Sequence, residues 1–356
     1  MQKTKSALWH IVKASKALGI LLPAFISLSV QAEQIKEEPV TVSVYVDNDA
    51  LTGGNKDEDY TGGFAITYSG TNATNHPFSI DKGLVWINRL TGISSAEEAA
   101  HSWHSCEAGL TAFTPTEKTI EQAIVNDRPY SSLIYLSNTQ QTVDEKSRSA
   151  IISSLTLGFL GLTLTGEVQN TIHGAIGSDK AEGWHNQISE GGEPTFKYSA
   201  TWQKYLITNN KNLQATTSLG LSIGYLTEAV AGASFRTGLL RTPWWSFNVH
   251  NSNYGEKSNI TVPTTTFLDE FYFLAGANMK LRAYNAFLQG QFRDSAVTYS
   301  IAELEPLVYE GWIGVGGELK SGIRLSYLLR YQSSELKTGL ADRGFSYGEL
   351  IVSYKF

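Results

Sequence analysis

The last eight residues, Glu349-Leu350-Ile351-Val352-Ser353-Tyr354-Lys355-Phe356, contain the clearest indication of the fold. Every second residue from Leu350 to Phe356 is apolar, whereas Ser353 and Lys355 occupy alternate positions. In an extended strand such alternation places apolar side chains on one face and polar side chains on the other. A closing strand of this kind that ends in phenylalanine is typical of outer-membrane barrels, where lipid-facing and lumen-facing residues alternate. A soluble edge strand is the alternative.

Similar alternating segments recur along the whole chain. We interpret thirteen of them as strands, but single-chain bacterial barrels have an even number. We therefore predict an all-β fold, a transmembrane antiparallel β-barrel of about twelve strands, with one pair miscounted near Ala233–Lys280. The thirteen segments are Thr41–Asn48, Thr61–Ser69, His104–Phe113, Ser132–Asn138, Ile151–Leu160, Thr195–Lys204, Thr217–Tyr225, Ala233–Leu239, Tyr272–Lys280, Ala286–Asp294, Val308–Leu319, Gly322–Gln332 and Ser346–Phe356.

Residues 1–32 predict a secretory signal peptide. Four lysines form a basic start, Leu18–Val30 is apolar, and Val30-Gln31-Ala32 fits a small-x-small cleavage site. The apolar run is too short to span a bilayer as a helix, although a retained anchor is the alternative. We expect residues 33–356 to form one outer-membrane barrel domain.

The net charge and the cysteine content exclude a nucleic-acid partner and two kinds of cysteine site. Removing the signal segment, with its four lysines and no acid, takes the net charge from −6 to −10. Nucleic-acid binding requires a basic face, so we expect no nucleic-acid partner. Cys106 is the only cysteine, which excludes an intrachain disulfide and a thiolate metal cluster. Its alternating surroundings favour a position in the barrel wall.

Strand parity assigns each connection to one rim of the barrel. If both termini are periplasmic, the outer connections include Asp49–Tyr60, Thr114–Ser131 and Gly161–Pro194. These three loops contain most of the candidate catalytic and ligand-binding residues. The connection Gly70–Trp103 falls on the periplasmic side, where short turns are expected, and its length has no explanation in the sequence.

The first outer loop is rich in oxygen ligands. Asn48 and Asp49 end one predicted strand and Thr61 begins the next, so a hairpin brings the three together. Carboxylate, amide and hydroxyl oxygens are the ligands that calcium prefers. A polar hairpin with ordinary turn residues explains the same pattern.

The third outer loop contains a short helical pattern over Glu167–Ile176, and a second such pattern covers residues 96–103. A helix would place Gln169 and His173 on one face, four residues apart. A neutral imidazole can accept a proton from water, although a hydrogen-bonded surface histidine is the ordinary alternative. The sequence has no HExxH or glycine-rich phosphate motif, which favours water activated by histidine.

The remaining outer-loop residues have weaker signals. Asp127 and Arg128 are adjacent and are expected to form an ion pair that orders the loop. Lys118 is a candidate contact for an anionic head group. Trp184 is a candidate for the membrane interface.

At these residues the chain resembles the outer-membrane lipid A 3-O-deacylase family. The resemblance covers most of the mature chain and is concentrated in residues 41–205. Its most specific part is the E-V-Q-N-x-x-H run. The matching motifs, in order, are Asn48-Asp49, Asp59–Gly63, Thr114-Pro115, Asp127-Arg128, Gly158–Gly161, Glu167–Asn170 with His173, and Gly183-Trp184 with Gln187.

The resemblance implies a hydrolase of the cell outer membrane. It implies Ca2+-dependent removal of the 3′-acyloxyacyl group from lipid A, the lipid part of lipopolysaccharide, by a monomer. A passive porin or binding barrel is the alternative, and a serine-dependent barrel esterase such as a phospholipase is a further one. The implied roles are His173 as general base, Gln169, Thr61, Asn48 and Asp49 as the other catalytic-site residues, Asn48 and Asp49 as cation ligands, and Lys118 as a substrate contact.

Overall fold

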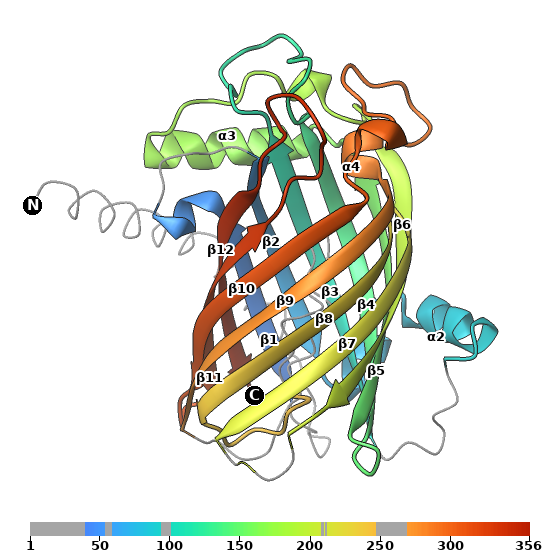
Figure 1. Ribbon diagram of the computed structural model, residues 1–356, viewed down its shortest axis with the longest axis vertical. Coiled ribbons are helices and arrows are strands. Elements are labelled where there is room, and N and C mark those ends of the chain that lie inside the picture. Colours follow the sequence, from blue (N-terminus) through green and yellow to red (C-terminus); the bar gives the residue numbers. More distant parts are fainter. Residues whose placement is uncertain (1–39, 54–58, 94–100, 208–209, 211, 247–268) are drawn as a thin grey trace, which may run out of the picture.

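Twelve antiparallel strands form a closed barrel in the computed structural model (Figure 1). Each strand pairs with its neighbours in the chain, and β1 pairs with β12 to close the sheet. The predicted all-β fold and strand number are confirmed. The structure describes residues 40–53, 59–93, 101–207, 210, 212–246 and 269–356, so the signal-peptide prediction lies outside the described residues.

The barrel strands are long and their connections carry short helices. The strands are β1 (Thr41–Asn48), β2 (Asp59–Ser69), β3 (His101–Thr114), β4 (Ser131–Asp144), β5 (Ser149–Leu160), β6 (Glu193–Tyr205), β7 (Leu213–Gly224), β8 (Leu226–Leu239), β9 (Glu270–Asn285), β10 (Leu307–Glu318), β11 (Ile323–Gln332) and β12 (Phe345–Lys355). The helices are α2 (Asp81–Leu90), α3 (Leu164–Ile176) and α4 (Ala286–Gln289), with 3-10 turns η1 (Asp49–Thr52), η2 (Thr71–Asn75), η4 (Trp184–Asn186) and η5 (Ile301–Glu303).

The closing strand has the predicted alternation. Tyr354 and Phe356 are exposed on the outer wall, whereas Ser353 and Lys355 are buried in the lumen. Val42 lies opposite Tyr354 in the β1–β12 pair, and the Phe356 amide donates to the carbonyl of Val40. The described ends of the chain therefore meet at one rim of the barrel.

One predicted strand is wrong. Ala286–Asp294 contains α4 followed by a loop rather than a strand, while both β8 and β9 are present near the region suspected of a miscount. The Asn285 side chain accepts from the Phe287 amide and caps the helix, and Gly290 ends it with a positive φ of 70°. Apolar side chains buried at successive positions imitated a strand, because α4 sits inside the barrel mouth.

The second helical pattern, residues 96–103, is corrected in part. Residues 101–103 belong to β3, and the preceding residues lie outside the described part of the chain. The long periplasmic connection contains α2, which packs on the outer wall beside β4 and β5. Cys106 lies in β3 as expected, with a free thiol.

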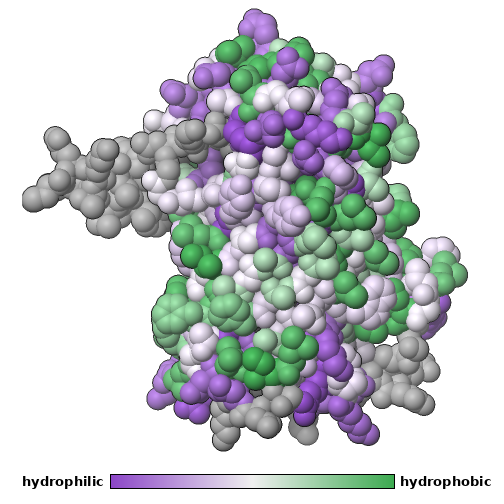
Figure 2. All heavy atoms as spheres, viewed as in Figure 1, coloured by the Kyte–Doolittle hydropathy of each residue, from purple (hydrophilic) through white to green (hydrophobic). Residues whose placement is uncertain are grey.

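Apolar side chains form patches on the outer wall, and strongly hydrophilic side chains are most frequent toward its two ends (Figure 2). Within the described residues no helix is long and apolar enough to cross a membrane. The exposed apolar wall residues alternate with buried ones, as a strand that faces lipid requires. They include Leu157, Phe159, Phe196, Leu219, Leu221, Ile223, Phe271, Phe273, Leu281, Ile313 and Leu325.

Ion pairs fill the lumen at several levels. Arg330 donates through Nε to Glu349 at 2.6 Å and through Nη1 to Glu310 at 2.9 Å. Lys280 also pairs with Glu310, at 2.9 Å, and all four side chains are buried. Such a lumen is packed by charge pairs rather than open to water, because a buried charge needs a close partner.

Removing one central cation from the lumen should destabilise the barrel. We expect Arg330→Leu to lower the free energy of unfolding by about 3–5 kcal/mol, since two buried carboxylates lose their guanidinium. The measurement is the temperature at which the heat-modifiable band shift on gels is lost. Lys320→Gln is the control, because Lys320 pairs with Asp269 on the exposed surface at 3.4 Å. Equal shifts for both variants would contradict the prediction.

Candidate active site

The three predicted outer loops lie at one end of the barrel (Figure 1). Segment η1, helix α3 and the β3–β4 loop gather at the upper rim, opposite the C-terminus. The parity argument is therefore correct for these loops. All the candidate residues belong to segments at this rim.

Segment η1 and the start of β2 hold the first group of candidate residues. Asn48 caps η1 by accepting from the Ala50 amide at 2.8 Å, and its Nδ2 donates to the Thr61 carbonyl. Asp49 is 6% exposed, and its Oδ1 also accepts from Ala50, at 2.7 Å. The predicted meeting of Asn48 with Thr61 is confirmed.

A bulge in β2 sets the position of Thr61. Tyr60 pairs with Phe113 and Gly62 with Ala112, so Thr61 is the extra residue of the bulge. Gly62 has a φ of 154°, and a Cβ atom there would lie 2.5 Å from the Asp47 carbonyl oxygen. Only glycine fits so close to β1. The bulge brings the Thr61 hydroxyl to 2.7 Å from the Thr114 hydroxyl.

This group lies on the outer side of the barrel wall. Asp47 and Tyr60 point into the lumen, where the Tyr60 hydroxyl donates to Asp47 at 2.9 Å. Asn48 follows Asp47, and Thr114 follows the lumen-facing Phe113, so both side chains point the other way. The oxygen atoms of Asn48, Thr61 and Thr114 therefore face the wall side rather than the lumen.

Helix α3 holds the second group. Gln169 and His173 share one face of the helix, as predicted, and this face is buried, with the two side chains 7% and 6% exposed. Leu164 and Ile172 of the same helix are exposed. The helix thus turns its polar catalytic candidates inward and an apolar edge outward.

One hydrogen bond determines the tautomer of His173. Its Nδ1 lies 2.6 Å from the carbonyl oxygen of Asp179. A carbonyl only accepts, so Nδ1 carries the proton of the neutral imidazole. The lone pair consequently belongs to Nε2, which is the nitrogen able to accept a proton. This arrangement suits a general base.

Asn170 holds the segment that supplies this carbonyl. Its Oδ1 accepts from the Ala181 amide at 2.8 Å, and its Nδ2 donates to the Ala181 carbonyl at 3.0 Å. Gly177 ends α3 with a φ of 75°, which lets the chain reverse and pass back along the helix. Asn170 is therefore a positioning residue for Asp179 and, through it, for His173.

Trp184 orients Gln169. The indole Nε1 donates to Gln169 Oε1 at 2.7 Å. The other end of the amide, Nε2, therefore points away from this bond. Gln169 Nε2 is buried without a hydrogen-bond partner among the described residues. Trp184 packs on Gly166, where a Cβ would lie 2.7 Å from the ring. Its predicted place at the membrane interface is wrong, because the side chain is 7% exposed.

The β3–β4 loop joins the two groups. The carbonyl of Lys118 accepts from the Tyr130 hydroxyl and from the Glu182 amide, each at 2.9 Å. The Tyr130 and Trp184 rings lie 5.0 Å apart. The Lys118 side chain is half-buried at this rim. Its role toward a substrate stays a prediction.

Asp127 and Arg128 order the loop through other partners than the one predicted. Asp127 accepts from the Thr116 amide at 2.8 Å, and Arg128 pairs with Asp59 and Glu335 in the buried interior. Adjacent side chains on an extended segment point to opposite sides, which separates the two charges. The expected pair between them is replaced by pairs with distant strands.

Tyr299 also forms a hydrogen bond with this loop. The Tyr299 hydroxyl donates to the Asp127 carbonyl at 2.8 Å. Burial raises the pKa of Tyr299, and the Asp127 carboxylate adds to that effect. The phenol therefore remains a neutral donor, which keeps the outer loop attached to the β9–β10 connection.

The oxygen atoms at and beside η1 could bind a hard cation, although only one of these donors is charged. Asp49 contributes a carboxylate, and Asn48 and Thr61 contribute neutral oxygens. In the described part of the chain, no three His, Cys, Asp or Glu side chains form a metal cluster. Calcium accepts a mixture of carboxylate, neutral oxygen and water ligands, so the donor chemistry is compatible with it.

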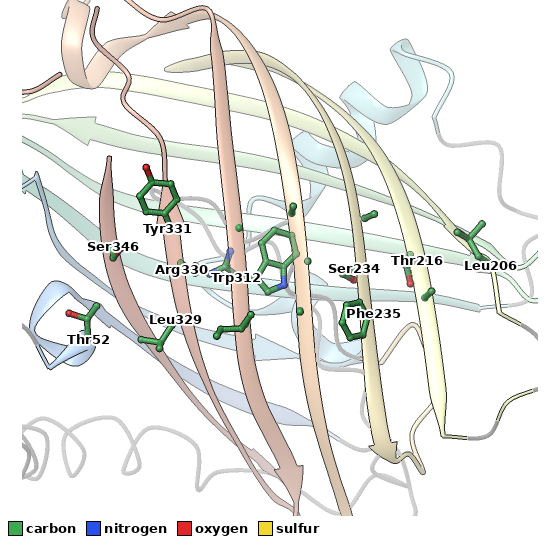
Figure 3. A pocket seen from close by; sticks show the side chains of 17 residues that line it. Thr52, Leu206, Thr216, Ser234, Phe235, Trp312, Leu329, Arg330, Tyr331 and Ser346 are labelled. Carbon is green, nitrogen blue, oxygen red and sulfur yellow. The ribbon is translucent and has the colours of Figure 1, made fainter. Parts of the chain in front are cut away.

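A shallow groove of about 900 Å³ runs along the wall from η1 (Figure 3). Thr52 lies at one end and Leu206 at the other, and the residues between them include large side chains such as Trp312 as well as alanines and glycines. Ala233 pairs with Ala277, which pairs with Gly311, so the groove crosses β8, β9 and β10. Thr52 of η1 lines this depression, whereas Asn48, Asp49, Thr61 and Thr114 do not.

Sequence reasoning missed three contributors. Thr114 and Asn170 belong to motifs already noticed, but their partners come from other segments. The Asp179 carbonyl has no signal at all, because any residue type supplies it. Asn170 could have been identified from the sequence as a polar residue on the inner side of the predicted helix.

The chain is similar to known outer-membrane proteins. The family described as Outer membrane protein LpxR matches residues 18–356. The structure of LpxR from Salmonella typhimurium has a TM-score of 0.66 and 19% identity, covering 88% of this chain and 99% of that chain. No curated protein matches the chain.

Other barrels are much less similar. A KdgM porin has a TM-score of 0.37 and 6% identity, covering 89% of this chain and 99% of that chain. The translocator domain of the autotransporter NalP from Neisseria meningitidis has a TM-score of 0.40 and 9% identity, covering 98% and 99%.

The clamp formed by Asn170 makes a structural prediction. Asn170→Ala removes both bonds to Ala181, and we expect the Ala181 amide to open more easily by roughly 1–2 kcal/mol, about 5- to 30-fold in hydrogen exchange. Exchange mass spectrometry of peptides over residues 178–183 measures this. Thr171→Ala is the matched control, since the exposed Thr171 hydroxyl bonds only within α3, to Glu167. Unchanged exchange in Asn170→Ala would refute the clamp.

Proposed function

Since this chain belongs to the outer membrane protein LpxR family, we propose that it is a lipid A 3-O-deacylase. It hydrolyses the 3′-acyloxyacyl ester of lipid A in the outer leaflet of the outer membrane. The observation that carries the proposal is His173, buried at the outer rim with Nδ1 bound to the Asp179 carbonyl. That bond leaves Nε2 as the proton acceptor.

The orientation of the candidate residues supports a lipid substrate. Asn48, Thr61 and Thr114 face the wall side of the rim, and a wall groove begins at η1. Lipid A lies in the leaflet that surrounds this rim. Its ester reaches such a site from the side, without entering the lumen.

The proposed chemistry uses His173 twice. Nε2 takes a proton from a water molecule as that water attacks the ester carbonyl. The resulting imidazolium keeps its Nδ1–H bond to Asp179, which stabilises the charged form. The ring then returns a proton to the leaving alkoxide. The buried donor Gln169 Nε2 is suited to the negative charge that develops on the carbonyl oxygen.

Calcium is part of the proposal. Asp49 and Asn48 would hold Ca2+, with neutral oxygens and water completing its ligands. When bound there, calcium polarises the ester carbonyl and supplies positive charge beside the developing oxyanion. We also propose that Lys118 contacts an anionic group of lipid A and that the enzyme acts as a monomer.

Two alternatives receive less support. A porin needs an aqueous lumen, whereas buried ion pairs such as Arg330–Glu349 occupy this one. A serine esterase needs its nucleophile beside His173. Ser132 donates to Gln187, and Ser153 is bonded to Asn88 of α2, on the periplasmic connection. Both hydroxyls are committed to structural bonds.

Loss of the proposed base should abolish the reaction. We expect His173→Ala to lower lipid A deacylation by about 100- to 10,000-fold, because a general base contributes that much. Mass spectrometry of lipid A from expressing cells measures the loss of one acyloxyacyl unit. His185→Ala is the matched control, since His185 lies exposed in η4 near the same rim. An unaltered lipid A profile with folded wild-type protein would refute the proposed activity.

Calcium dependence gives a separate test. We expect chelation with EDTA to stop deacylation by purified protein, and added calcium to restore it. Asp49→Asn removes the one carboxylate of the donor set, so it should raise the calcium concentration needed for half-maximal rate. Asp144→Asn, at the exposed end of β4, is the control. Full activity in EDTA would exclude calcium while leaving the histidine chemistry untouched.

A further inference from the structure

Helix α2 is attached to the outer wall of the barrel rather than to its rim (Figure 1). Leu84 is fully buried and packs against Leu155 of β5 and Tyr198 of β6. Both wall residues point outward, because they alternate with lumen-facing neighbours. The helix therefore covers part of the surface that elsewhere carries exposed apolar side chains.

The covered wall is polar. Asn138 and Gln140 of β4 and Ser153 of β5 all point outward beneath α2. Asn88 Nδ2 donates to Gln140 Oε1 and to Ser153 Oγ, each at 2.8 Å. Asn138 Oδ1 accepts from the Ile80 amide at 2.8 Å. These groups use the helix as their hydrogen-bonding partner.

Further bonds hold the two ends of α2. Asp81 lies 2.8 Å from Nδ1 of His104, another outward residue of β3. The Tyr198 hydroxyl donates to Asn88 Oδ1 at 2.8 Å. Polar wall groups without such partners would be costly against hydrocarbon. These hydrogen bonds therefore fix α2 against the outer face of the barrel wall.

The other face of α2 combines apolar and basic side chains. Trp86 and Leu90 are 62% and 67% exposed, and Phe78 just before the helix is 64% exposed. Lys82 and Arg89 are exposed on the same side, since positions 82, 86 and 89 share one helical face. This combination of an aromatic, an aliphatic and two cations is typical of helices that lie in a membrane interface.

The position of α2 agrees with that interface. On β6 the exposed Trp202 lies four residues closer to the periplasmic end than Tyr198, on the same outer face. Tryptophan is enriched where hydrocarbon meets head groups. The outer face of α2 is therefore continuous with the apolar wall and lies near its periplasmic border.

We propose that α2 lies in the periplasmic leaflet of the outer membrane, where its outer face binds anionic phospholipid. Trp86 and Leu90 enter the boundary between head groups and acyl chains. Lys82 and Arg89 contact lipid phosphates. This inference is independent of the proposed hydrolase activity and explains why a periplasmic connection is so long.

A spin label can measure the depth of this face. The test uses the full mature chain in vesicles of phosphatidylethanolamine and phosphatidylglycerol, with Cys106→Ala and a nitroxide on Trp86→Cys. Lys146→Cys in the exposed β4–β5 turn is the aqueous reference, and Leu219→Cys on the exposed wall is the hydrocarbon reference. We expect the label at residue 86 to collide more with oxygen than with a water-soluble nickel complex, as at residue 219.

Every other result overturns the proposal. Collisions like those at residue 146 would place α2 in water, and shielding from both reagents would indicate a covering protein or a second copy. A second variant tests the charge. Lys82→Gln with Arg89→Gln should move the residue 86 label toward water, and exchanging phosphatidylglycerol for phosphatidylcholine should do the same to the parent. No shift in either case would exclude anionic lipid as the ligand.

Discussion

The hydrocarbon of a membrane offers no hydrogen bonds, and this constraint organises the whole molecule. Every backbone amide and carbonyl in the wall needs a partner, so the sheet has to close. The β1–β12 pair provides that closure and brings Val40 beside Phe356. Once both ends meet at one rim, alternation of strand direction assigns every connection to a side. The position of the candidate site follows from this count, because α3 and η1 both belong to the opposite rim.

The same constraint explains which parts could be predicted from sequence. Strand alternation is a local property, so the pattern at residues 350–356 already separates wall from lumen. The shared face of Gln169 and His173 is equally local, since it depends only on helical period. The grouping of Asn48 with Thr61 required one added step, a hairpin between neighbouring strands.

The remaining features depend on contacts between distant segments. Thr61 meets Thr114 only because a bulge shifts the register of β2. The partners of Arg128 are carboxylates far away in the chain, and no local rule selects them. Residues 286–294 imitated a strand because the barrel mouth buries three consecutive apolar residues, Ala286, Phe287 and Leu288. Trp184 belongs to a motif that sequence can find, but its bond to Gln169 comes from the fold.

The outward direction of Asn48 and Thr114 also determines how molecules are supplied to the site. A lumen-facing site would draw on a solution and respond to concentration per volume. A site at the wall draws on the surrounding leaflet, where molecules arrive by lateral diffusion and are counted per area. The packing and fluidity of that leaflet then set the encounter rate, so two bilayers with equal total lipid but different order present this protein with different working conditions.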